Sequence, residues 1–356
     1  MNIKSLAAGL ALCVTAVCAD AFILESKNTD IFPLGIYGVT EPEEVAVVKA
    51  AGFNTVQTYS GNPEVIAALA KACRQQNMKL LAYPDKIVPS KYFLESSDWP
   101  ILAWYLFDEP DVVGLDPAQL LEKDLVTKRN FPGQHTVFVV GEGLAALKYG
   151  KSADIVMMDW YPVPHLKLES VGKQVGITRN MLQTLDLKDK PVWAVLQAFD
   201  WKDYPQRSKK RIGRFPEAYE IRFMTYDALI NGARGLFYFT FKARDNDELP
   251  YYPEKWQALT DTVGEIKELL PVLENGTPEK CPVPLANLEA KAWLYKGKTY
   301  LILANPTENN ILIPEPFPDS AKWEPLFERS SDLADLVPER KTPYMKPYRV
   351  FVFKSR

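Results

Sequence analysis

The chain carries, at residues 99–111, the stretch Trp-Pro-Ile-Leu-Ala-Trp-Tyr-Leu-Phe-Asp-Glu-Pro-Asp. Its segment Ile101 to Phe107 is entirely apolar, rich in aromatic residues and too short for an independent helix, which predicts a strand buried on both faces. Asp108 and Glu109 follow at the carboxyl end, and Pro110 ends the strand. Two carboxylates at the mouth of a buried strand are costly unless they are paired or used, so this stretch predicts a site.

Short apolar runs and helical segments alternate along the chain on both sides of this stretch. The predicted strands are 31–37, 53–59, 78–84, 101–107, 136–140, 154–160, 191–197 and 235–241. The predicted helices are 40–51, 62–77, 116–130, 143–149, 169–185, 216–232 and 253–270, with only a short, poorly helical connection after the third strand. Eight strands alternating with helices predict an α/β fold, a parallel (β/α)8 barrel.

The pattern changes after Pro271. Short alternating segments, separated by turn signals, replace the helices at 290–295, 299–304, 310–313 and 349–354. We therefore expect a barrel over residues 22–276 and a small C-terminal antiparallel β-sandwich over residues 277–356.

Residues 1–21 are typical of a secretory signal peptide. One lysine precedes an apolar run from Ser5 to Cys18, and Ala19-Asp-Ala21 fits a small-residue cleavage site. We expect cleavage after Ala21 and a secreted or periplasmic protein, with a lipoprotein anchor as the less favoured alternative. Cys73 and Cys281 remain after cleavage; they could pair in an oxidising compartment, or Cys73 could be a buried thiol.

The bulk composition excludes some classes of function. With 47% apolar residues, the chain of 356 residues can bury a sizeable core, and its net charge of −3 does not favour a nucleic-acid partner. Only two histidines are present, which disfavours a histidine-rich metal site. We expect no metal or organic cofactor, no membrane-spanning segment in the mature chain, and a monomer.

In a barrel of this kind, side chains at the carboxyl ends of the strands form one surface. This surface is predicted to hold carboxylates, amides and aromatic rings, which suit sugars because hydroxyls need polar acceptors and sugar faces stack on rings. The substrate-binding candidates are Tyr37, Gln57, Tyr59, Asp85, Asp108, Tyr161, Gln197, Asp200, Trp201 and Tyr238. Glu109 is the first candidate for a general acid, and the competing interpretation pairs it with Arg222 or Arg234.

The segment from Trp104 to Asp111 resembles the strand-four motif of barrel glycoside hydrolases, in which a glutamate before proline is the acid/base. Residues 191–199, 214–216 and 232–238, with Glu220 and Arg222, are similar to secreted bacterial proteins of that superfamily. The resemblance covers most of residues 31 to 241. It implies hydrolysis of a glycosidic bond in an oligosaccharide or polysaccharide.

The sequence departs from the best-known clan of that superfamily at two positions. Asp108 stands where the clan has asparagine, and Gln197 stands where it has a nucleophilic glutamate, so its two-step mechanism does not carry over. Asp159 is the first candidate for the partner of Glu109, Glu220 the second and Asp200 the third.

Three alternatives remain open at the level of the sequence. Asp108 and Glu109 could instead act with an amide group of the substrate itself, although neighbouring residues of a strand point to opposite faces. Gln197 makes a carbohydrate-binding barrel without catalysis plausible. A lyase is the third possibility.

Overall fold

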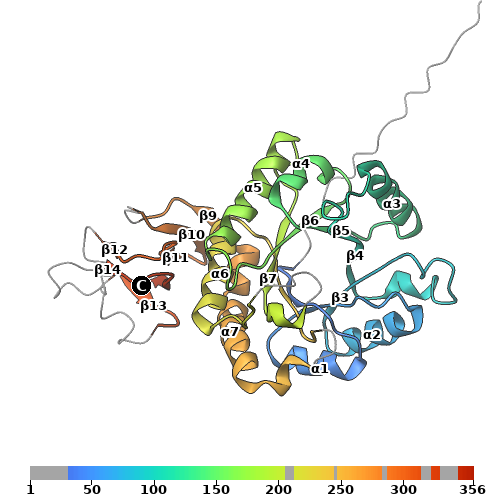
Figure 1. The fold of residues 1–356 in the computed structure, drawn as a ribbon, viewed down its shortest axis with the longest axis horizontal. Helices are drawn as coiled ribbons and strands as arrows, with labels where there is room; N and C mark the ends of the chain where they lie inside the picture. Colours follow the sequence, from blue (N-terminus) through green and yellow to red (C-terminus); the bar gives the residue numbers. More distant parts are fainter. Residues whose placement is uncertain (1–30, 205–211, 244–246, 283–286, 314–321, 329–343) are drawn as a thin grey trace, which may run out of the picture.

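The computed structural model describes residues 31–204, 212–243, 247–282, 287–313, 322–328 and 344–356. Eight parallel strands close into a barrel in the order of the chain (Figure 1). The predicted (β/α)8 barrel is therefore confirmed. Its strands are β1 (Leu34–Ile36), β2 (Thr55–Gln57), β3 (Lys79–Ala82), β4 (Ile101–Asp108), β5 (Thr136–Val140), β6 (Ile155–Trp160), β7 (Val192–Gln197) and β8 (Leu236–Phe239).

Within the described ranges, seven α-helices surround the strands or follow them. Four begin with proline at a first helical position, where the missing N–H costs nothing. The connection after β3 forms only turns and the 3₁₀ helix η1 (Glu95–Asp98), as the sequence predicts. The helices are α1 (Pro42–Ala50), α2 (Pro63–Gln75), α3 (Pro117–Asn130), α4 (Ala146–Tyr149), α5 (Ser170–Thr184), α6 (Ala218–Ile230) and α7 (Pro253–Asn275).

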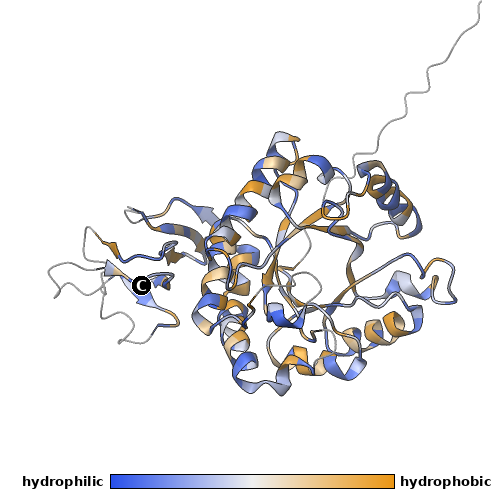
Figure 2. Ribbon diagram, viewed as in Figure 1, coloured by the Kyte–Doolittle hydropathy of each residue, from blue (hydrophilic) through white to orange (hydrophobic). Residues whose placement is uncertain are grey.

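In β3 to β8, the residues of each strand are divided between two apolar layers, and the strands are the most uniformly hydrophobic part of the ribbon (Figure 2). The outer layer packs against the helices, and the inner layer fills the barrel. Trp193 stacks on Phe237 inside the barrel, with ring centroids 5.5 Å apart. A Cβ atom at Gly35 would lie 2.3 Å from the Phe237 ring, so glycine at this position makes room for the filling.

The segment after α7 forms an antiparallel sheet of five strands in the order β13-β15-β11-β10-β9. One face packs on α6 and α7, which lie between it and the barrel (Figure 1). The other face packs on Ile311 and Met345 of a two-stranded ribbon, β12 and β14. The ribbon takes the place of the second layer of the expected sandwich. The strand bounds are β9 (Thr277–Glu279), β10 (Glu289–Tyr295), β11 (Lys298–Ala304), β12 (Ile311–Leu312), β13 (Trp323–Pro325), β14 (Tyr344–Met345) and β15 (Val350–Ser355).

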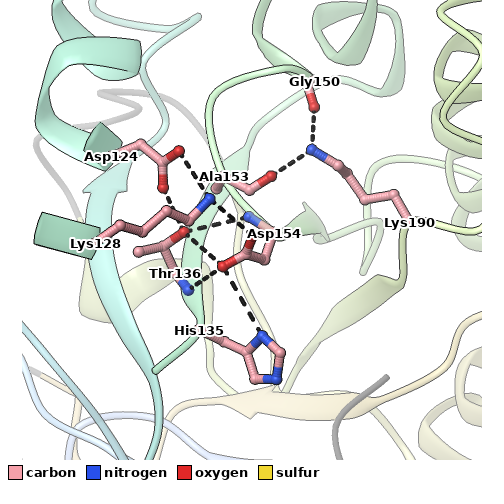
Figure 3. A network of polar contacts seen from close by, with 8 residues as sticks. All are labelled: Asp124, Lys128, His135, Thr136, Gly150, Ala153, Asp154 and Lys190. Atoms are coloured by element: carbon pink, nitrogen blue, oxygen red, sulfur yellow. Dashed lines mark hydrogen bonds and ion pairs between the residues drawn. The ribbon is translucent and has the colours of Figure 1, made fainter. Parts of the chain in front are cut away.

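A polar network closes the amino-terminal end of the barrel beneath β5 and β6 (Figure 3). Lys128 bonds Asp124 at 3.0 Å and Asp154 at 2.8 Å, and the Thr136 hydroxyl donates to Asp124 at 2.5 Å. Burial raises the pKa of Asp154, but hydrogen bonds from His135 and Lys128 outweigh it and hold this pKa below its usual value. Since this end lies opposite the strand carboxyl ends, we interpret the network as structural.

Three predictions concern the N-terminal segment, membrane-spanning helices and the pairing of the two cysteines. The expected signal peptide, residues 1–21, lies outside the described residues. No helix within the described ranges is long and apolar enough to cross a membrane. Cys73 is buried on α2, and it forms no disulfide with Cys281 beside the C-terminal sheet.

Arg222 of α6 joins the barrel to the C-terminal sheet. Its guanidinium donates to both carboxylate oxygens of Glu265 on α7 at 2.9 and 2.8 Å, to the Val350 carbonyl at 2.7 Å, and to Glu328 at 2.8 Å. Burial raises the pKa of Glu328, and the charge of Arg222 opposes this shift. The arginine therefore compensates a carboxylate that is otherwise expensive to bury.

Replacing Arg222 by methionine should leave the buried carboxylate of Glu328 without its cationic partner. We expect Arg222→Met to lower the free energy of unfolding by about 3–5 kcal/mol, measured by urea denaturation. Arg129→Met is the control, because Arg129 is exposed on α3, and it should change stability by less than about 0.5 kcal/mol. Equal losses in the two variants would contradict the role given to Arg222.

Candidate active site

A pocket of about 110 Å³ opens at the carboxyl ends of the barrel strands. Three carboxylates and six aromatic rings line it, drawn from the ends of β2, β4, β6, β7 and β8 and the loops that follow them. This is the end of the barrel at which the sequence predicts a site. The lining residues are Tyr59, Asp108, Glu109, Asp159, Tyr161, Phe199, Trp201, Tyr204 and Phe239.

Glu109 follows β4 in a left-handed backbone conformation, with φ at +50°. This conformation costs a non-glycine residue roughly 1–2 kcal/mol and is often retained at functional sites. The Glu109 N–H donates to the Val139 carbonyl of β5 at 3.1 Å, which holds the turn in place. The expectation that Asp108 and Glu109 point to opposite faces is therefore wrong: the turn breaks the strand alternation, and both side chains line the pocket.

The Glu109 carboxylate lies above Gly141, just after β5. A Cβ atom at residue 141 would lie 3.5 Å from Oε1 of Glu109 and 2.9 Å from a methyl group of Val112. Glycine at this position therefore leaves space for the carboxylate and for the loop that carries it.

Asp159 at the end of β6 is the most deeply buried carboxylate of the pocket, with 7% of its surface exposed. Its Oδ1 atom makes no hydrogen bond with any described residue. Burial raises the pKa of Asp159 well above its usual value, and the charges of Glu109 and Asp108 raise it further. A side-chain hydrogen bond with Glu109 acts in the same direction. The shift favours the protonated form of Asp159.

Asp108 rests on a layer of phenols below the pocket. The Tyr105 hydroxyl donates to Oδ1 of Asp108 at 2.7 Å, and the Tyr105 ring contacts the Tyr37 ring edge-to-face, with centroids 6.1 Å apart. Tyr37 in turn donates to the sulfur of Met157 at 3.4 Å. Burial raises the pKa of both phenols, so they remain protonated donors. The layer fixes the orientation of Asp108, and it places Tyr37 beneath the pocket rather than on its wall.

Aromatic rings form the wall of the pocket. Phe199 contacts Tyr161, Trp201 and Tyr204 edge-to-face, with ring centroids 5.1, 5.0 and 5.1 Å apart. Phe239 lies 5.7 Å from Tyr161. Such rings present apolar faces of the kind on which sugars stack. Phe199, Tyr204 and Phe239 are absent from the sequence-based candidates.

The alternation of β8 places Phe239 and its neighbour Tyr238 on opposite faces of the strand. Phe237 and Phe239 face the interior, whereas Tyr238 points outward and bonds the Thr225 hydroxyl of α6 at 2.8 Å. Tyr238 therefore does not reach the pocket. A strand buried on both faces gives no polarity contrast, so the sequence alone could not choose between the two faces.

Three further candidates have structural partners and do not line the pocket. Asp85 is half-exposed and pairs with Lys123 at 2.9 Å. Asp200 accepts from the Lys202 N–H at 2.9 Å and caps the 3₁₀ helix η3 (Trp201–Asp203). Gln57 is fully buried, and its amide donates to the Thr58 carbonyl at 3.1 Å.

Glu220, the second candidate for a catalytic partner, lies outside the pocket on α6. Arg214 binds both of its carboxylate oxygens, at 2.6 and 2.7 Å, and the Glu217 N–H donates to it at 2.8 Å. The Glu220 carboxylate therefore caps the amino-terminal end of α6. Arg222 binds Glu265 and Glu328, which disfavours the alternative in which it neutralises Glu109.

Gln197, at the end of β7, is fully buried and serves the neighbouring loop. Its Oε1 accepts from the Val163 N–H at 2.8 Å, and its Nε2 donates to the Val163 carbonyl at 2.9 Å and to the Phe199 carbonyl at 3.3 Å. The amide holds the loop after β6, which carries Tyr161. Only a group with both a donor and an acceptor makes this pair of bonds.

Among the described residues, no group of three or more histidine, cysteine or acidic side chains has an arrangement that could hold a metal ion. The pocket can instead exchange protons through its carboxyl pair and receive a ligand between its aromatic rings.

No family model matches the chain, and no curated protein matches its sequence. Solved structures match it through the fold. An α-amylase from Geobacillus thermoleovorans, complexed with acarbose, has a TM-score of 0.55 at 10% identity, over 93% of this chain and 99% of that one. A GH30 endoxylanase from Clostridium papyrosolvens C71 has a TM-score of 0.55 at 10% identity, over 94% and 98%. A structure described as a glycoside hydrolase has a TM-score of 0.58 at 12% identity, over 91% and 92%. The chain thus has the barrel fold of these glycoside hydrolases.

A carboxylate in place of the buried Gln197 amide should destabilise the protein. We expect Gln197→Glu to lose the donor to Val163, to bury a carboxylate, and to lower the free energy of unfolding by about 1–3 kcal/mol. The measurement is urea denaturation at pH 7. Gln119→Glu on the exposed face of α3 is the matched control, and a loss no larger than that of the control would refute the assigned role.

The raised pKa of Asp159 makes stability depend on pH. A carboxyl group whose pKa is raised by folding stabilises the protein fully below its unfolded pKa, about 3.9, and this contribution falls as pH rises through the folded pKa. We therefore expect Asp159→Asn to gain stability over the wild type as pH rises, by up to about 1.4 kcal/mol for each unit of the shift. Denaturant unfolding at pH 5 and pH 8 measures this difference. Asp98→Asn, at an exposed position, should show no such trend.

Proposed function

We propose that the protein is a secreted glycoside hydrolase that cleaves an O-glycosidic bond with the carboxyl pair Glu109 and Asp159. The observation that carries this proposal is the pair itself: Glu109 and Asp159 line one aromatic pocket, and burial together with the charge of Glu109 raises the pKa of Asp159 well above its usual value. Glycosidic cleavage needs one carboxyl group that is protonated and one that is ionised.

The raised pKa favours Asp159 as the proton donor, whereas the sequence-based prediction assigned this role to Glu109. In the proposed reaction, Asp159 gives its proton to the glycosidic oxygen as the bond to the anomeric carbon breaks. Glu109 stabilises the positive charge that develops at that carbon. A water molecule then attacks the carbon, its hydroxyl group stays on the product, and its remaining proton passes to the Asp159 carboxylate, which restores the acid. The hydrogen bond from Tyr105 holds Asp108 beside this charge as a further anion.

The substrate class rests on the wall of the pocket and on the comparisons. Tyr59, Tyr161, Trp201 and Phe239 offer rings against which the apolar faces of a sugar can pack. The α-amylase structure contains acarbose, and the GH30 neighbour is an endoxylanase. Both facts support an oligosaccharide or polysaccharide substrate.

A carbohydrate-binding barrel without turnover is the second candidate. The observation in its favour is Gln197, which stands at the strand-seven position of a nucleophilic glutamate and whose amide is committed to the Val163 backbone. Under this alternative, the aromatic pocket would bind a sugar and the carboxyl pair would only anchor its hydroxyl groups.

Glu109→Gln separates the two candidates. In an enzyme, we expect kcat on a cleaved glycan to fall by about 10²–10⁴-fold while the Kd for that glycan changes little. A panel of glycans with product NMR provides the substrate, and calorimetry provides the Kd. The control is Glu142→Gln, an exposed carboxylate after β5.

Three outcomes would overturn the hydrolase proposal. Full activity in the Glu109→Gln variant would show that Glu109 takes no part in the reaction. Binding of glycans without any cleavage by the wild type would favour the binding barrel. An unsaturated sugar among the products would indicate a lyase.

A further inference from the structure

Asp111 ends the Asp-Glu-Pro-Asp stretch and is not among the residues that line the pocket, yet its carboxylate joins the loops on either side of Glu109. Oδ1 of Asp111 accepts from the Gly141 N–H at 3.1 Å, and Oδ2 accepts from the Glu142 N–H at 3.2 Å. Hydrogen bonds to an ionised acceptor are stronger than those between neutral groups. The loop after β4 is therefore fastened to the loop after β5 at this point.

The short segment between Glu109 and Asp111 is restrained along its length. Pro110 is buried, its ring fixes its own backbone, and its carbonyl accepts from the Tyr149 hydroxyl of α4 at 3.2 Å. The Glu109 carbonyl accepts from the Val112 N–H at 3.1 Å. A displacement of the Asp111 carboxylate is therefore transmitted to Glu109, two residues earlier.

The turn at Glu109 needs such a restraint because its backbone favours another conformation. Its φ of +50° lies in the left-handed region, whereas a residue before proline favours an extended backbone. An extended Glu109 would continue the alternation of β4, and its side chain would point to the face opposite that of Asp108. The Glu109 carboxylate would then leave the pocket.

The carboxylates of Asp111 and Glu109 lie next to the same position of the β5 loop. A Cβ atom at residue 141 would lie 3.5 Å from Oε1 of Glu109 and 3.6 Å from Oδ2 of Asp111. Burial raises the pKa of Asp111, the Gly141 N–H opposes this shift, and the charge of Glu109 adds to it. The two carboxylates therefore repel each other, and the main-chain N–H donors hold Asp111 in place against this repulsion.

We propose that Asp111 is a positioning residue for the carboxyl pair: by bonding the loop after β5, it keeps Glu109 in the left-handed turn and inside the pocket. This role rests on the glycoside hydrolase activity proposed above, because Asp111 is assigned an effect on turnover through Glu109. Asp111 itself does not touch the substrate. Its replacement should lower kcat and leave the aromatic wall, which comes from other strands, able to bind a sugar.

Asp111→Asn tests the proposal, because it keeps the size of the side chain and replaces one acceptor by an N–H donor that faces a main-chain N–H. We expect kcat on a glycan cleaved by the wild type to fall by about 10–100-fold, with KM changed by less than about threefold. The matched control is Asp116→Asn, since Asp116 accepts from the Ala118 N–H at 2.9 Å as the N-cap of α3. Asparagine caps helices as well as aspartate does, so kcat of this control should stay within about twofold of the wild type.

A double-mutant cycle with Glu109→Gln separates positioning from general damage to the protein. If Asp111 acts only through Glu109, adding Asp111→Asn to Glu109→Gln should lower kcat further by less than about twofold. Full kcat in the Asp111→Asn variant would overturn the proposal. An equal loss from Asp111→Asn with and without Glu109 would also overturn it.

The titration of Asp159, followed by ¹³C NMR of labelled aspartate, gives a readout that needs no substrate. Besides burial, the charge of Glu109 raises the pKa of Asp159. Asp111→Asn should therefore lower this pKa as Glu109 turns away, and it should have no such effect in the Glu109→Gln background. Absence of glycan cleavage by the wild type would refute the hydrolase, whereas an Asp159 pKa that Asp111→Asn leaves unchanged would refute the positioning role alone.

Discussion

Glu109 and Asp159 repel each other whenever both are ionised, and Asp159 cannot lower this cost by turning to water because it is almost fully buried. Protonation of Asp159, which its raised pKa favours, relieves the repulsion. The surrounding structure must therefore keep two groups together that would separate in a flexible chain. The phenol layer below Asp108 and the rings around Tyr161 exclude water and limit the movement of the carboxylates. In the proposed reaction, this arrangement supplies the proton.

The parts that hold this pair are distributed over four neighbouring strands. The turn at Glu109 is fixed by its bond to Val139 of β5, and Gly141 leaves the space into which the carboxylate turns. Gln197 of β7 holds the loop after β6 through Val163. The geometry of the pocket therefore depends on the closure of the barrel, since parallel neighbours bring these strand ends together.

The barrel could be predicted from the sequence because each strand and helix has its own local signal, and the Asp-Glu-Pro stretch marked the strand that carries the site. The details of the pocket depended on information that the sequence does not contain. Tyr238 and Phe239 are equally apolar neighbours, and only packing against Thr225 on one side and Tyr161 on the other distinguishes them. Glu220 looked available because its partner Arg214 lies in a loop, whose position a sequence pattern cannot give. The residue in the left-handed turn is Glu109 itself, and without a glycine at this position the sequence does not predict the turn.

Arg222 has a consequence for the order in which the chain matures. Its partners Glu328 and Val350 lie 106 and 128 residues further along the chain, so a ribosome releases α6 long before they exist. During that interval, the side of α6 and α7 that later receives the sheet remains uncovered. We therefore expect nascent chains to need protection from aggregation on this surface until β15 has been synthesised. The small C-terminal sheet would thus be the last part to pack, onto a barrel whose own strands were synthesised much earlier.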